Sequence, residues 1–99
     1  MEEIPAGFGK GSKPPRTVTN ALVGTTVLLR CNPTGIPKPS IMWERGSLVI
    51  LSGGRFRILP NGNLEIKNVT TLDSSLYTCV VTNRLGRASR SGRLKVHST

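Results

Sequence analysis

Residues 64–79 read LEIKNVTTLDSSLYTC, and this stretch decides the fold. Leu64 and Ile66 are apolar with a polar residue between them, which is the period of a strand with one buried face. Tyr77 and Cys79 repeat that spacing farther along, after residues 70–75, which are polar except for Leu72. The stretch therefore predicts two short strands joined by a tight connection, each with one face turned inward.

Outward from this stretch, short apolar runs alternate with Gly, Pro and Asn turn signals at the spacing typical of an all-β sandwich. Residues 60–63 (PNGN) predict a hairpin turn, in which Asn-Gly would supply two positive-φ positions. We find no helix longer than one turn. The remaining inward candidates lie at alternate positions of the expected strands: Val27, Leu29, Cys31, Ile41, Trp43, Val69, Val81, Leu94 and Val96.

Four residues, in order and spacing, resemble the signature of an immunoglobulin domain: Cys31, Trp43, Tyr77 and Cys79. The resemblance implies an immunoglobulin-like Greek-key β-sandwich of two antiparallel sheets. It also implies a disulfide between Cys31 and Cys79 that joins the sheets, with Trp43 packed against it. The hydroxyl of Tyr77 is then expected to hold the corner before the second cysteine.

Three motifs are similar to those of the intermediate (I-set) group: residues 35–43 (GIPKPSIMW), residues 64–79, and Asn83-x-x-Gly86 followed by Leu94-x-Val96. Ser75 is a small departure, because glycine or alanine is usual there. The resemblance covers residues 14–97 as one domain and implies a structural ion pair between Arg55 and Asp73. The group includes contactin-type adhesion molecules, cell-surface receptors, matrix proteins and the muscle protein titin.

The first thirteen residues, MEEIPAGFGKGSK, are rich in glycine and lack periodicity. They predict a flexible lead-in, with Met1 as an added start. No apolar run of a secretion signal is present in residues 1–15, so any such signal is expected outside this fragment.

The net charge of +9 is high for 99 residues, and it predicts attraction to polyanions. The charge is densest near the C-terminus, at Arg84, Arg87, Arg90, Arg93 and Lys95. Alternation puts Arg93 and Lys95 on the solvent face of the last strand, and Arg84 and Arg87 near the turn before it. This stripe is a candidate site for a sulfated glycosaminoglycan such as heparin. The alternative is an edge strand whose charges prevent sheet-to-sheet aggregation.

Two further features are candidates for modification or contact. Asn68-Val69-Thr70 is an acceptable N-glycosylation sequon, whereas Pro33 excludes the triplet that begins at Asn32. Met42 and Val80 are expected to face outward on one sheet beside the apolar residues 48–51, where they would form a protein contact surface.

The sequence favours no enzyme, metal or cofactor site. His97 is the only histidine and lies near the end of the chain, so no nucleophile–histidine arrangement can be assembled in the domain. Its three carboxylates, Glu44, Glu65 and Asp73, lie on different expected strands and make no acid–base pair or metal cage. Three of the four aromatic residues are core candidates, which argues against a stacking platform for nucleic acid. No apolar stretch is long enough to insert into a membrane.

The sequence therefore predicts a non-catalytic recognition or adhesion module of an extracellular protein, secreted or part of a membrane protein's ectodomain. Protein partners or neighbouring domains are expected. The alternative is a structural spacer domain of an intracellular muscle or cytoskeletal protein, with Cys31 and Cys79 as buried thiols. The compartment separates the two hypotheses, because disulfides persist in oxidising surroundings.

Overall fold

The computed structural model describes residues 2–9 and 18–98. Among these residues it has ten strands and one short 3-10 helix, η1. The elements are β1 (Ile4–Phe8), β2 (Val18–Leu22), β3 (Val27–Leu29), β4 (Pro33–Ile36), β5 (Ser40–Arg45), β6 (Leu48–Ile50), β7 (Phe56–Ile58), β8 (Leu64–Ile66), η1 (Thr71–Asp73), β9 (Ser75–Asn83) and β10 (Gly86–His97).

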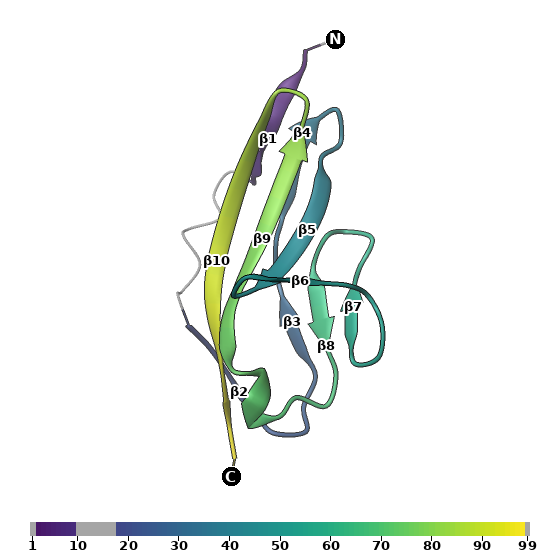
Figure 1. The fold of residues 1–99 in the computed structure, drawn as a ribbon. Coiled ribbons are helices and arrows are strands. Elements are labelled where there is room, and N and C mark those ends of the chain that lie inside the picture. Colours follow the sequence, from purple (N-terminus) through teal and green to yellow (C-terminus); the bar gives the residue numbers. More distant parts are fainter. Residues whose placement is uncertain (1, 10–17, 99) are drawn as a thin grey trace.

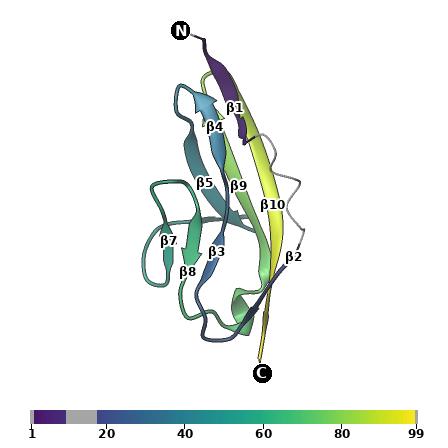
Figure 2. The same cartoon turned by 180° about the vertical axis from the view of Figure 1, so that it is seen from behind.

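The strands form the two layers of a sandwich, as predicted (Figures 1 and 2). One layer is a five-stranded sheet in the order β2-β10-β9-β5-β6, and the other is a three-stranded sheet in the order β3-β8-β7. A small pair, β1 with β4, lies at the end opposite the C-terminus (Figure 1). All pairings are antiparallel except that of β2 with β10.

The core lies between the layers and is built from the alternating residues of both. The Cys31 and Cys79 sulfurs are bonded, which confirms the expected bridge between residues 48 positions apart. Trp43 lies directly opposite Cys79 in the β5–β9 ladder, so the indole and the disulfide share the inner face. The buried cluster also contains Val27, Leu64, Ile66, Val69, Tyr77, Val81, Leu94 and Val96. Period-two alternation thus located the core because each strand has one face against the other layer.

The prediction of a flexible lead-in over residues 1–13 is wrong for residues 4–8, which form β1. This strand pairs with β4, and Ala6 is buried. It lacks a visible pattern because Pro5 and Gly7 interrupt it, and its hydrogen-bond partners lie far away in the sequence. Asn83 supplies one of them, since its Oδ1 accepts a hydrogen bond from the Ala6 amide at 3.1 Å. The expected boundary at residue 14 lies outside the described residues.

The turn between β7 and β8 also differs from the sequence prediction. Gly62 has a φ of 92°, but Asn61 does not have a positive φ, so the expected pair of positive-φ residues is absent. Five residues separate the strands, and the turn closes through the Gly62 amide, which donates to the Leu59 carbonyl at 2.8 Å. The longer loop turns Asn63 inward, where its Oδ1 accepts from the buried Cys31 amide at 3.0 Å.

Candidate recognition surface

The basic residues of β10 divide between the two faces of the strand. Arg87, Arg93 and Lys95 alternate with inward-facing residues and are exposed on the outer face of the five-stranded sheet. At about 3.3 Å per residue, the stripe from Arg87 to Lys95 spans roughly 26 Å. Over residues 93–97, β10 is not the sheet edge that was expected, because β2 pairs with it there. Edge protection therefore does not explain Arg93 and Lys95.

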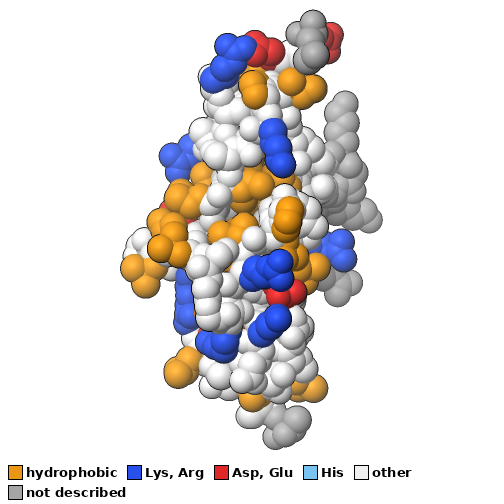
Figure 3. Space-filling model, turned by 90° about the vertical axis from the view of Figure 1, so that its right-hand side faces the viewer, with side chains coloured by type: hydrophobic (Ala, Val, Ile, Leu, Met, Phe, Trp, Pro, Cys, Tyr) orange, Lys and Arg blue, Asp and Glu red, His pale blue; other side chains and the backbone are white. Residues whose placement is uncertain are grey.

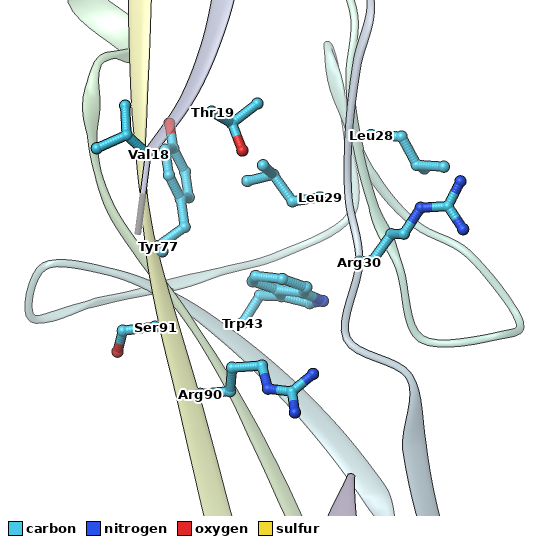
Figure 4. A pocket seen from close by; sticks show the side chains of 10 residues that line it. Val18, Thr19, Leu28, Leu29, Arg30, Trp43, Tyr77, Arg90 and Ser91 are labelled. Atoms are coloured by element: carbon cyan, nitrogen blue, oxygen red, sulfur yellow. The ribbon is translucent and has the colours of Figure 1, made fainter. Parts of the chain in front are cut away.

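Arg90 does not belong to this outward stripe. In the β9–β10 ladder it lies opposite Cys79, so its side chain projects to the inner side of the sheet. Its guanidinium carbon is 4.4 Å from the centre of the Phe8 ring. It lines a hollow of about 410 Å³ at the side of the sandwich, together with Arg30, Trp43 and Tyr77 (Figure 4). Arg90 is close to Arg87 and Arg93 in sequence, but alternation along β10 places its side chain on the opposite face.

Arg84 lies in the turn between β9 and β10, where it forms an ion pair with Glu3. Glu3 directly precedes β1, so the pairing depends on the N-terminal strand that the sequence analysis did not predict. Part of the charge of Arg84 is therefore balanced within the domain. The outward cations that remain from the predicted set are Arg87, Arg93 and Lys95.

Asp73 is the centre of a polar cluster at the other end of the sandwich. The carboxylate is 2% exposed and accepts hydrogen bonds from Arg55 at 2.8 and 3.1 Å and from the Thr70 amide at 2.8 Å. Arg45 lies 3.8 Å from the same carboxylate. The Arg55 hydrogen bonds, supported by Thr70 and by the positive charge of both arginines, hold the pKa of Asp73 below its ordinary value despite burial. The Arg55–Asp73 pair is thus part of the framework.

Tyr77 and Trp43 are fixed by hydrogen bonds to backbone carbonyls. The Tyr77 hydroxyl donates to the Asp73 carbonyl at 2.7 Å, and the Trp43 indole N–H donates to the Gly62 carbonyl at 2.8 Å. Burial raises the pKa of Tyr77. Each ring therefore places its polar atom against the backbone while its apolar body fills the core.

Sequence reasoning missed three residues that fix the framework. Arg45 contributes to the Asp73 cluster, Asn63 satisfies the Cys31 amide, and Asn83 holds β1. Asn83 appeared only as part of a turn motif. These motifs and turn signals did not reveal the contact of Asn83 with β1, of Asn63 with Cys31 or of Arg45 with Asp73, because the partner groups are distant in the sequence.

The candidate contact residues Met42 and Val80 lie opposite each other in the β5–β9 ladder, on the outer face. Val80 is only 4% exposed, however, so neighbouring side chains cover it. A shallow hollow there is lined by Glu44, Thr78 and Arg87 as well as Val80. Val80 therefore lies at the bottom of this hollow and does not offer an exposed apolar surface to a partner.

Asn68 of the sequon lies in the turn after β8, with a φ of 51° and an exposed side chain. Its carbonyl accepts a hydrogen bond from Arg55 at 3.2 Å, so the backbone at this position is tied to the framework.

Within residues 2–9 and 18–98, no group of three or more His, Cys, Asp or Glu residues could hold a metal ion. No described helix is long and apolar enough to cross a membrane.

Comparison with known proteins connects this geometry to other molecules. The family described as the immunoglobulin I-set domain matches residues 11–96. Contactin-4 of Homo sapiens is 41% identical over 81 residues, which cover 82% of this chain but only 8% of contactin-4. The chain therefore spans less than a tenth of that relative.

Solved structures with the same fold include immunoglobulin domains of two other proteins. Sidekick-1 immunoglobulin domains 1–4 match with a TM-score of 0.85 and 25% identity, over 96% of this chain and 25% of that one. Titin domain M7 matches with a TM-score of 0.83 and 27% identity, over 98% of each chain.

Proposed function

The chain belongs to the immunoglobulin I-set family, and from that membership we propose that it is a non-catalytic recognition or adhesion module of an extracellular protein. The observation that carries the proposal is the Cys31–Cys79 disulfide in a chain similar to contactins. A bridge of this kind persists where the surroundings are oxidising. Closing a loop of this length adds about 4 kcal/mol in the chain-entropy model, which matters for so small a core.

The location is tested with an antibody raised against this domain. Staining of intact, unpermeabilised cells that express the natural protein is the expected result. Staining that requires permeabilisation, together with free thiols at Cys31 and Cys79 in protein alkylated inside the cell, would overturn the proposal. That result would instead support an intracellular spacer domain, the role favoured by the likeness to titin M7.

Glycosylation at Asn68 is part of the same proposal. The side chain is exposed, so the transferase can reach it. When the domain is secreted from mammalian cells, mass spectrometry of the Asn68 peptide should show glycan. A peptide that is wholly unmodified would refute the assignment.

The outward stripe of Arg87, Arg93 and Lys95 is the proposed contact for a sulfated glycosaminoglycan. Three cations on one face of a single strand form a linear array, which fits a linear polyanion, and the net charge of +9 adds attraction at longer range. Retention on immobilised heparin should therefore fall steeply with salt.

Charge-reversal variants distinguish heparin binding at this stripe from binding that depends only on the net positive charge. The double variant R87E/R93E should elute from heparin at lower salt than R57E/K67E, although both changes alter the net charge equally. Arg57 lies on β7 of the other sheet, and Lys67 directly follows β8, so neither belongs to the stripe. Equal losses in the two variants would contradict a defined glycan site.

A further inference from the structure

The strand β1 belongs to neither layer of the sandwich and has few of the contacts that hold an ordinary strand. Among the described residues it pairs only with β4, in a separate two-stranded sheet, and its register shifts between Ile4 and Gly7. Pro5 has no amide hydrogen to donate to a ladder. Ala6 is the one buried residue of β1, and Ile4 is 45% exposed. A strand with so little pairing and burial opens at a lower cost than the core strands do.

The side chain of Asn83 binds the backbone of β1. Its Oδ1 accepts from the Ala6 amide at 3.1 Å, and its Nδ2 donates to the Ile4 carbonyl at 2.8 Å. A neighbouring strand binds an extended segment in the same way, through backbone groups of alternate residues. The Asn83 amide is also bonded to the Leu85 N–H and the Pro37 carbonyl, both at 3.0 Å. These two partners lie outside β1, so they orient the amide independently of that strand.

Two side chains, one at each end of β1, are also bound. Glu3, directly before the strand, forms an ion pair with Arg84. Phe8, the last residue of the strand, has its ring centre 4.4 Å from the guanidinium carbon of Arg90, which is a cation–π contact. The binding residues therefore fit an extended segment with an acidic residue first and an aromatic residue five positions later.

Gly35 allows this segment to approach the backbone of β4. A Cβ at residue 35 would lie 3.2 Å from the Ala6 Cα and 3.0 Å from the Asn83 Nδ2, both of which are closer than ordinary contacts. We call residues 2–8 the arm. The arm site consists of the residues that bind it from outside: Gly35, Asn83, Arg84 and Arg90.

The charges of the arm and of the rest of the chain are opposite. The arm contains Glu2 and Glu3 and no basic residue, whereas the rest contains all 14 basic residues and three of the five acidic ones. The formal charge is therefore −2 for the arm and +11 for the rest. Figure 3 shows acidic side chains beside Lys and Arg at the end of the molecule that holds β1, and mainly Lys and Arg among the charged side chains elsewhere on this face. The rest of another copy attracts the arm in the same way.

We propose that the arm also binds the arm site of a second copy, so that two copies exchange β1 and form a dimer. The occupant follows from the fit, because the site contacts Glu3, Ala6 and Phe8, and a second copy carries the same residues in the same order. Each contact of β1 can form between copies as it does within one, so the exchange needs no new contact and depends on concentration. The inference does not rest on the proposed extracellular role, since a spacer domain can exchange a strand equally well.

The experiment mixes two variants of the full chain that each add one cysteine, Ile4→Cys and Ile36→Cys, with one of them labelled with nitrogen-15. Ile4 and Ile36 lie directly opposite each other in the β1–β4 ladder. A disulfide between position 4 of one copy and position 36 of the other therefore reports an arm bound to a second copy. Mass spectrometry of the linked peptides should detect this bond, and its yield should rise with protein concentration.

The control mixes Ile4→Cys with Leu72→Cys. Leu72 is 81% exposed, compared with 39% for Ile36, and it lies on η1. Random collisions therefore favour a bond to position 72, whereas exchange of β1 favours a bond to position 36. The yield of the bond to position 36 should be higher by about tenfold, because the bound arm holds the two cysteines together.

Two changes in the arm site should lower this yield to that of the control. Gly35→Ala, added to Ile36→Cys, places a Cβ against the arm, and Arg84→Glu repels Glu3 from a side chain that is 66% exposed. The change matched to Gly35→Ala is Gly53→Ala, because Gly53 has a φ of +155° against +151° for Gly35 but no atom within 4 Å of its Cβ. Gly53→Ala should leave the yield unchanged, and the thermal midpoint of each variant shows whether it is folded.

A chain that carries both Ile4→Cys and Ile36→Cys should form the bond within itself at low concentration, which checks the register. Three results would overturn the proposal. They are the absence of a bond in this double variant, a yield at position 36 no higher than at position 72, and a yield that neither Gly35→Ala nor Arg84→Glu lowers.

Discussion

Arg55 and Asp73 form a two-pronged ion pair, with Nη1 2.8 Å from Oδ2 and Nη2 3.1 Å from Oδ1. The carboxylate is buried, whereas the Arg55 side chain is 40% exposed. The two residues therefore differ in what their removal exposes. Loss of Asp73 leaves Arg55 beside water, but loss of Arg55 leaves a buried carboxylate with its Thr70 and Arg45 contacts.

Asp73→Ala should lower the free energy of unfolding by about 2–4 kcal/mol, because the change removes the buried acceptor of several charge-assisted hydrogen bonds. Chemical denaturation at pH 7 measures this loss. The control is Arg57→Ala. Arg57 is an exposed arginine on β7, two residues after Arg55, so its loss should change the free energy of unfolding little. An unchanged midpoint for Asp73→Ala would show that the cluster is not structural.

The contribution of Asp73 should depend on pH. Its folded pKa lies below the value of about 3.9 of an unfolded aspartate, so on acidification the unfolded chain takes up the proton first. The stabilisation is therefore complete above about pH 5 and is lost as the pH falls through about 4 towards the folded pKa. Urea denaturation of the natural sequence and of Asp73→Asn should show a stability gap at pH 7 that narrows at pH 3. A gap that stays constant would contradict this linkage.

Gly62 should tolerate no side chain. Its φ is +92°, and a Cβ there would lie 2.7 Å from Ile41 Cδ1 and 3.1 Å from Pro33 Cγ. Gly46, with a φ of +58° and open space around it, is the matched control. Gly46→Ala should cost about 1 kcal/mol for the backbone conformation, and Gly62→Ala about 1–3 kcal/mol more for overpacking. Thermal unfolding, followed by the fluorescence of the single tryptophan, compares the stabilities of the two variants. Equal losses of stability would show that the contacts with Ile41 and Pro33 do not matter.

Asn83 should control the attachment of β1. Its side chain accepts from the Ala6 and Leu85 amides at 3.1 and 3.0 Å and donates to the Ile4 and Pro37 carbonyls at 2.8 and 3.0 Å. In Asn83→Ala, hydrogen exchange of residues 4–8 should accelerate by about tenfold, which corresponds to the loss of roughly one net hydrogen bond. The control is Asn20→Ala, which removes a side chain that hydrogen-bonds His97 on the neighbouring strand β10 and should leave β1 unchanged. Equal exchange rates of residues 4–8 in the two variants would show that groups other than Asn83 keep β1 in place.

The core was predictable because it depends on spacing along single strands, whereas the disulfide was expected from the resemblance to immunoglobulin domains. Leu64, Ile66, Tyr77 and Cys79 each follow the two-residue period, and every one of them is buried. The same rule separates Arg87 and Arg93 from Arg90, although closeness in sequence grouped them together. For the candidate surface, the sequence shows how dense the basic residues are between positions 84 and 95, but the grouping of Arg90 with Arg87 and Arg93 is incorrect because their side chains lie on opposite faces of the strand.

Alternation of apolar residues and the positions of two cysteines, one tryptophan and one tyrosine determined the sandwich, since a strand buries every second side chain wherever it lies. Only the tertiary structure decided that β1 is a strand, that β2 covers the side of β10 and that Val80 is buried. These features depend on groups up to about 80 residues apart, such as Asn83 with Ile4 and Arg93 with Val18. A periodic pattern records which way a side chain points, but it carries no information about which distant segment lies beside it.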